Sequence, residues 1–101
     1  MPNLTFTSAV RTWLQDRRAV EFPGQWEATQ YKFYVAGEVL EDLGGLEDGV
    51  NPDSALRVFD DHQGVLLPAA DFLWAHSDKM QDEYVITREF FRKFQRDHTA
   101  S

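Results

Sequence analysis

Carboxylates are the most abundant reactive groups in this sequence, and they are concentrated in its middle part. Between residues 37 and 83 there are twelve Asp and Glu residues against two bases, Arg57 and Lys79, which gives this segment a charge of −10. Such a charge fits a solvated surface that keeps a small protein soluble, a docking face for a basic partner, or a mimic of nucleic-acid phosphate. The candidate interaction face consists of six acids: Glu38, Glu41, Asp42, Glu47, Asp48 and Asp53.

Histidine next to carboxylate is a pattern that can bind a divalent metal ion. His62 follows Asp60 and Asp61, and His76 lies two residues before Asp78. A helical metal pair needs ligands at positions i and i+4, whereas three consecutive helical residues point in different directions. The sequence also has no His-Glu-x-x-His motif, no calcium loop and no cysteine. We therefore expect no metal ion and no other cofactor.

Nucleophilic catalysis would require a cysteine or an activated serine, and the sequence has no cysteine. None of the serines lies in a Gly-x-Ser-x-Gly elbow: Ser8, Ser54, Ser77 and Ser101. Acid pairs such as Glu41–Asp42 and Asp82–Glu83 have the right groups for acid–base chemistry, but nothing places them in an apolar pocket. Gly44–Gly45 follows a helical pattern instead of preceding one, which argues against a phosphate-binding loop. We expect a protein that is not an enzyme.

Length and composition indicate a single domain that spans residues 1–101, with 43% hydrophobic and 14% aromatic residues. The lack of cysteine fits a reducing compartment. The N-terminal residues have no basic stretch followed by a long apolar run, and no apolar run is long enough to span a membrane. We expect a soluble cytoplasmic protein, and the net charge of −7 argues against nucleic-acid binding.

The clearest structural element is the stretch from Tyr31 to Gly45, which predicts a strand that turns directly into a helix. Apolar residues alternate from Tyr31 to Val35 and then follow helical spacing after Gly37. Gly44 and Gly45 predict the end of the helix, since glycine adopts the left-handed conformation without a Cβ clash.

The residues before this element predict the rest of a small sheet. Residues 4–6 form a minimal N-terminal strand, and residues 8–18 are expected to be irregular. Residues 19–22 form a second strand, Pro23–Gly24 predicts a turn, and residues 26–35 form the return strand of a hairpin. Trp26 and Tyr34 are candidate exposed aromatics, which often anchor interfaces.

A long apolar helical pattern begins at Asn51–Pro52, a strong helix start, and continues to Trp74. Pro68 interrupts it, and Gly64 leaves room for the backbone to bend. Two interpretations remain: one long helix kinked near residues 64–68, which we prefer, or two helices with Pro68 starting the second.

The C-terminal residues predict a polar loop over residues 77–82, a strand over residues 83–87 and a final helix capped by Thr87. The final helix has an apolar stripe (Phe90, Phe91 and Phe94) and three bases (Arg92, Lys93 and Arg96). Together the elements predict an α+β fold. In it, a small antiparallel sheet, formed by the hairpin and the N- and C-terminal strands, packs against a long kinked helix and shorter helices.

Several motifs occur in a characteristic order: LTF, Trp13, AVEFPG, YKFYVAGEVLEDLGG, ALRVFDDH and YVITREFF. From Leu4 to Phe91 this order resembles the small bacterial proteins grouped as domain of unknown function 1488. The resemblance implies a small cytoplasmic α+β domain with no established activity, and it supplies no catalytic residues. In that family a cysteine is frequent at the position of Phe33, and a basic residue often follows the position of His62, where this chain has Gln63.

Three functional hypotheses follow. The first is a non-enzymatic interaction or regulatory module that binds an unknown protein or forms a homodimer, with the acidic residues 38–53 as its charged face. The second is a small-molecule sensor or enzyme with a pocket between the sheet and the kinked helix near residues 64–68. The third is a nucleic-acid-associated regulator that uses the basic C-terminal helix.

Overall fold

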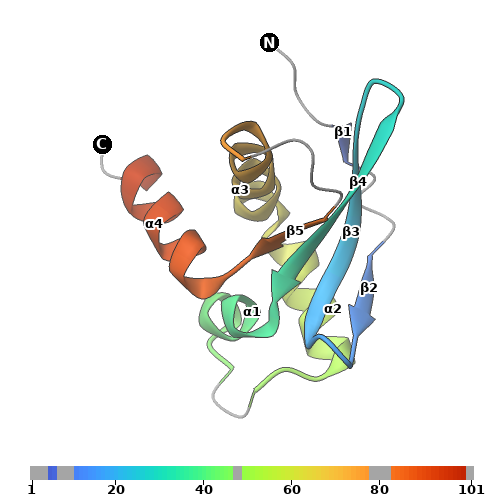
Figure 1. Cartoon of the computed structure of the whole chain (residues 1–101). Coiled ribbons are helices and arrows are strands. Elements are labelled where there is room, and N and C mark those ends of the chain that lie inside the picture. Colours follow the sequence, from blue (N-terminus) through green and yellow to red (C-terminus); the bar gives the residue numbers. More distant parts are fainter. Residues whose placement is uncertain (1–4, 7–10, 47–48, 78–82, 100–101) are drawn as a thin grey trace.

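The computed structural model describes residues 5–6, 11–46, 49–77 and 83–99 of the 101-residue chain. Its elements follow in the order β1 (Thr5–Phe6), β2 (Thr12–Leu14), β3 (Ala19–Trp26), β4 (Thr29–Ala36), α1 (Gly37–Gly44), α2 (Pro52–Asp61), α3 (Gln63–Ala75), β5 (Glu83–Ile86) and α4 (Arg88–Thr99). Figure 1 shows α2 and α3 behind the sheet and α4 at its side, and the predicted α+β class is confirmed. Within the described ranges, no helix has the length and apolar character needed to cross a membrane.

β3 lies inside the sheet, paired with β4 on one edge and with β1 and β2 on the other, and all three pairs are antiparallel. β5 pairs with the far edge of β4 and runs parallel to it, with Tyr84 opposite Phe33. The sheet is thus mostly antiparallel, as expected, and the predicted direction of the C-terminal strand is wrong. The reason is the connection, because α1, α2 and α3 return the chain to the starting end of β4 before β5 begins.

The predicted turn at Pro23–Gly24 is wrong, because β3 passes through both residues without a break. All eight residues of β3 have a partner in β4, so the hairpin turns at Glu27 and Ala28. Glu27 adopts the left-handed conformation with a φ of 56°. Turns of this kind are usually marked by glycine or asparagine, and the true turn has neither residue to indicate it.

Tertiary contacts explain why Pro23 and Gly24 belong to a strand. A Cβ atom on Gly24 would lie 2.6 Å from Cε1 of Phe33 and 3.0 Å from Cε1 of Phe6, so the glycine makes room for two aromatic rings. On the outer edge of β3, β1 pairs with residues 24–25 and β2 with residues 19–21, which leaves Pro23 between them. A proline is tolerated there because no strand among the described residues needs its missing N–H group.

The irregular segment expected over residues 8–18 contains a strand, β2, whose residues pair with Ala19 to Glu21. Residues 8–10 lie outside the described part of the chain. Trp13 of β2 is half-buried against the core and donates its indole N–H to the side chain of Gln15 at 3.0 Å. Three residues of pairing are too short to produce an alternating sequence pattern, which is why this strand was missed.

The long kinked helix is also a wrong prediction, since two helices, α2 and α3, meet at His62. Pro68 lies inside α3 and does not start it. The break at His62 lies two residues before the segment 64–68 where a kink was expected, and six residues before Pro68. His62 leaves helical geometry with φ −118° and ψ 21°, and its Nδ1 lies 3.0 Å from the carbonyl oxygen of Val58. Histidine often stabilises the end of a helix in this way, and Gly64 lowers the helix propensity just beyond it.

Aromatic side chains form the core between the sheet and the helices. The ring of Phe33 stacks between Phe22 at 5.7 Å and Tyr84 at 5.4 Å, centroid to centroid. Phe59 of α2 lies 5.0 Å from Phe22, and Trp74 of α3 is 1% exposed. The inward face of the β4 strand is therefore the one that the alternating pattern predicted.

Three predicted helix ends are confirmed. Gly45 takes the left-handed conformation that terminates α1, with a φ of 63°. Asn51 accepts a hydrogen bond from the backbone N–H of Ser54 at 2.8 Å, and the Ser54 hydroxyl accepts one from the Asn51 N–H at 2.9 Å. Thr87 caps α4 by accepting a hydrogen bond from the N–H of Phe90 at 3.1 Å.

Candidate functional site

α1 presents three of the predicted acids on the side opposite its buried residues, Val39 and Leu40: Glu38, Glu41 and Asp42. The structure therefore brings half of the candidate interaction face together on one short helix. Asp53 is exposed in the first turn of α2, and Glu47 and Asp48 lie outside the described residues.

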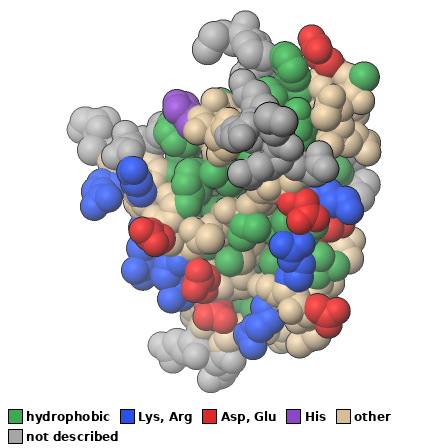
Figure 2. All heavy atoms as spheres, in the orientation of Figure 1, with side chains coloured by type: hydrophobic (Ala, Val, Ile, Leu, Met, Phe, Trp, Pro, Cys, Tyr) green, Lys and Arg blue, Asp and Glu red, His purple; other side chains and the backbone are tan. Residues whose placement is uncertain are grey.

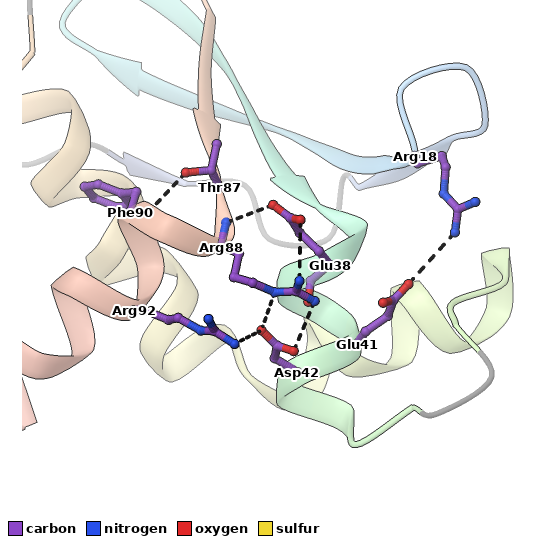
Figure 3. Close-up of polar contacts among 8 residues, drawn as sticks. All are labelled: Arg18, Glu38, Glu41, Asp42, Thr87, Arg88, Phe90 and Arg92. Atoms are coloured by element: carbon purple, nitrogen blue, oxygen red, sulfur yellow. Dashed lines mark hydrogen bonds and ion pairs between the residues drawn. The ribbon is translucent and has the colours of Figure 1, made fainter.

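The acids of α1 face the first turns of α4, and Figure 3 shows the contacts. The Nε atom of Arg88 lies 2.8 Å from Oδ2 of Asp42, and its Nη1 atom lies 3.8 Å from Oε2 of Glu38. The backbone N–H of Arg88 donates to Oε1 of Glu38 at 3.2 Å, so this carboxylate also satisfies a free group at the start of α4. Arg92 adds a longer contact to Asp42 at 3.8 Å. We call this set of four residues the α1–α4 clasp.

The clasp changes the character of the acidic face. The hydrogen bond from Arg88 to Asp42, with further attraction from neighbouring acids, raises the pKa of the Arg88 guanidinium above its usual value. Glu41 is also matched by a cation, since its carboxylate lies 3.9 Å from Nη2 of Arg18. The acids of α1 are thus largely neutralised within the chain, and they offer a basic partner less charge than the sequence suggested.

The other side of the clasp is a groove between α1 and α4, with a volume of about 480 Å³. Its lining contains four cations and two acids: Arg88, Arg92, Lys93, Arg96, Glu38 and Glu89. Figure 2 shows Lys and Arg side chains gathered over α4 with Asp and Glu among them. The sequence predicted a basic final helix, and the structure adds that its cations line a hollow.

A second groove of about 460 Å³ lies between α3 and α4 and is mostly apolar. Its lining consists of Phe72, Leu73, His76, Ser77, Phe90, Lys93 and Phe94. The Phe72 ring lies 5.5 Å from Phe94, 6.3 Å from Phe90 and 4.1 Å from the imidazole of His76. We call this hollow the α3–α4 groove. The sequence indicated the apolar stripe of α4, but it did not show that α3 would supply the opposite wall.

The expectation that Tyr34 is exposed is wrong. The side chain is 2% exposed on the sheet face opposite the helices, beneath Arg17, whose Cζ atom lies 4.0 Å from the ring centroid. Its hydroxyl donates to Glu83 at 3.0 Å. Burial, together with hydrogen bonding to the carboxylates of Glu21 and Glu83, raises the pKa of Tyr34 to about 12. Trp26 is half-buried, and its ring centroid lies 5.5 Å from that of Trp74.

The residues considered for metal binding or catalysis have structural contacts. Asp60 accepts two hydrogen bonds from Arg11, at 2.9 and 2.6 Å, and the imidazole of His76 contacts the carbonyl of Phe72 at 3.0 Å. Across the described ranges, no three His, Asp or Glu side chains are grouped in a way that could hold a metal ion. Gly64 and Pro68, where a ligand pocket was expected, are exposed and line neither groove around α4.

Comparison with known proteins places this fold in a family. The family model described as "Protein of unknown function (DUF1488)" matches residues 4–73, more than half of the chain. The chain belongs to the DUF1488 family. The match runs from β1 to residue 73 within α3, so five of the seven residues that line the α3–α4 groove lie outside it.

A solved member of the DUF1488 family has a similar fold. It is the crystal structure of a protein of unknown function from Shewanella loihica PV-4, and it matches this chain with a TM-score of 0.73 and 24% sequence identity. The match covers 87% of this chain and 96% of the other. No curated protein matches the sequence. At this identity the likeness concerns the fold alone, so functional arguments depend on the surface of this chain.

Proposed function

We propose that this DUF1488 protein is a non-enzymatic interaction module that binds an apolar helical segment of another protein in the α3–α4 groove. The observation that carries the proposal is the aromatic lining of that groove. Phe72, Leu73 and Phe90 are each only partly buried although they surround a hollow of about 460 Å³. Partly exposed aromatic walls between two helices are typical of surfaces that accept an apolar helix face.

The proposal of a non-enzymatic role has its own support. The described carboxylates nearest to α4 form ion pairs with arginines, and the imidazoles of His62 and His76 contact carbonyl oxygens at helix ends. A general acid or base needs a titratable group that is aimed at a substrate, and these groups are engaged in holding the fold. The absence of cysteine from the sequence supports localisation in a reducing compartment such as the cytoplasm.

The test uses Phe90, because its replacement by glutamate preserves the helix while it alters the groove. Phe90 lies three residues after the cap Thr87, so Phe90→Glu creates a Thr-x-x-Glu capping box and adds a favourable charge at the start of α4. The same change removes one aromatic wall and places a carboxylate in the apolar hollow. Gln30→Glu, at an exposed position of the β3–β4 hairpin, adds the same charge elsewhere and is the matched control.

The measurement is a tagged pull-down from a lysate of the native host, with the wild type and both variants side by side. We expect at least one protein to be recovered by the wild type and by Gln30→Glu and to be lost by Phe90→Glu. Circular dichroism must show equal folding of the three proteins. Equal recovery by all three, with the fold intact, would contradict the groove as the binding surface.

A further inference from the structure

The charge around the α3–α4 groove indicates what it binds. Lys93 and His76 are its ionisable lining residues, and no carboxylate is among the residues that line it. Lys93 also lines the neighbouring α1–α4 groove, so it stands on the ridge of α4 between the two hollows. The apolar groove therefore has a cationic border on its α4 side.

Lys93 and Arg96, which both line the neighbouring α1–α4 groove, have no ionic partner within the described residues. Arg88 is tied to Asp42 and Glu38 in the clasp, whereas Lys93 and Arg96 are exposed and form no ion pair with any described residue. The chain as a whole has a net charge of −7, so unpaired cations beside an apolar surface go against its overall balance. A partner with carboxylates at this edge would supply these two cations with a counter-charge that no ion pair among the described residues supplies.

We propose that the occupant is an amphipathic helix of a partner protein, with apolar residues on one face and carboxylates along the edge that meets α4. This inference rests on the proposed function and specifies the chemistry of its partner. The apolar face fills the hollow lined by Phe72, Phe90 and Phe94. The acidic edge lies against Lys93, which lines both hollows, and reaches Arg96 one helical turn further along α4 in the α1–α4 groove. The lining consists of the last turn of α3 with the two residues after it, and of residues 90–94 in α4. Anchors at positions i and i+4 match a groove of this length.

A second copy of this chain fits the surface less well. If α4 packed against α4 of another copy across a two-fold axis, Lys93 and Arg96 of each copy would approach the same cations of the other. An acidic segment avoids this repulsion. A flat anionic surface, such as a lipid bilayer or a nucleic-acid backbone, would attract the cations but would leave the concave apolar lining unfilled.

The test starts with a display library of random helical peptides that is panned on the full-length protein, with Phe90→Glu used to remove peptides that bind elsewhere. Synthetic versions of the enriched peptides are then titrated by fluorescence polarisation. The decisive variant is Lys93→Glu with Arg96→Glu. Its matched control is Lys32→Glu with Arg57→Glu, which changes the net charge equally at two exposed cations without an ion pair to a described residue.

We expect groove-dependent peptides with apolar residues at positions i and i+4 and with a net negative charge. Reversing the charges of Lys93 and Arg96 should lower the affinity of these peptides about tenfold, because two exposed attractive charge pairs become repulsive. The control reversal should change affinity less than about twofold, by long-range charge alone. A peptide whose acids are replaced by lysine should prefer the reversed variant.

The other outcomes separate the two proposals. Groove-dependent peptides without acidic residues, unaffected by the reversal, would overturn the partner chemistry and leave the groove function standing. The absence of any groove-dependent peptide would overturn both. In that case, binding of the wild type to vesicles of equal phosphatidylglycerol and phosphatidylcholine, or to duplex DNA, would assign α4 to an anionic surface. A dimer in sedimentation that Phe90→Glu dissociates would assign the groove to a second copy.

Discussion

Gly24→Ala tests the claim that Gly24 serves close packing and not a turn. A Cβ atom at this position would lie 2.6 Å from Cε1 and 3.1 Å from Cδ1 of Phe33. Phe33 has no free space into which it can retreat, because its side chain is 0% exposed and its ring stacks between Phe22 and Tyr84. The clash must therefore be relieved by shifting the centre of the sheet.

The expected cost follows from two opposing effects. Forcing one extra carbon into a filled core costs about 1–3 kcal/mol. Replacing glycine by alanine reduces the freedom of the unfolded chain, which stabilises the fold by about 0.4–1 kcal/mol where the native backbone allows it. We therefore expect Gly24→Ala to lower the free energy of unfolding by about 1–2 kcal/mol, and to lower the melting temperature by roughly 4–16 °C for a domain of this size.

Urea unfolding followed by circular dichroism, in a double-mutant cycle with Phe33→Leu, assigns the cost to its cause. Leucine lacks the Cε1 atom that the new methyl group would meet, so Gly24→Ala should cost at least about 1 kcal/mol less in that background. Additive effects, within about 0.5 kcal/mol, would refute the packing argument. A stabilising effect of Gly24→Ala alone would refute it as well.

Three further predictions concern other contacts. Folding raises the pKa of Tyr34 to about 12, against about 10 in the unfolded chain. The hydroxyl therefore contributes stability that is fully present below pH 10 and is lost as the pH rises to 12. Urea unfolding at several pH values should show that the wild type loses more stability between about pH 10 and pH 12 than Tyr34→Phe does. Asn51→Ala should lower the free energy of unfolding, measured by thermal unfolding, by about 1 kcal/mol. Asn51→Asp keeps the acceptor for the Ser54 N–H group and should lower it much less. Asp42→Lys should destabilise the fold most at low salt, and adding Arg88→Glu should restore part of the lost stability, because Glu38 and Arg92 keep their own charges.

Local chemistry accounts for the parts of the fold that the sequence predicted. Asn51 and Thr87 satisfy the first N–H groups of their own helices, and Gly45 ends α1 by its own conformation. Each of these contacts joins residues within five positions of one another, so the pattern that specifies it is contained in a short stretch. The same holds for the alternating residues of β4, whose inward face is set by the strand period.

The errors come from contacts between distant residues. Pro23 and Gly24 have the composition of a turn, but the ring of Phe33 and the register of β3 with β4 decide that they belong to a strand. Tyr34 alternates with buried residues and was therefore expected outside, yet Arg17 covers its ring from a different part of the chain. Neither contact leaves a local pattern, since each depends on how the sheet is assembled.

The acids of the candidate interaction face also contact residues that are distant in the sequence, and these contacts affect how the face can be tested. Reversing the charge of the acids on α1 is the direct test of the candidate interaction face. However, Asp42 holds Arg88, 46 positions away, so reversing Asp42 places two cations together and weakens the attachment of α4, which forms one wall of the α3–α4 groove. Lost binding would then have two explanations. The swapped pair, Asp42→Lys with Arg88→Glu, restores an ion pair between these two positions, while Glu38 and Arg92 keep their own charges. Restored binding by the swapped pair would therefore assign the loss to the weakened attachment of α4.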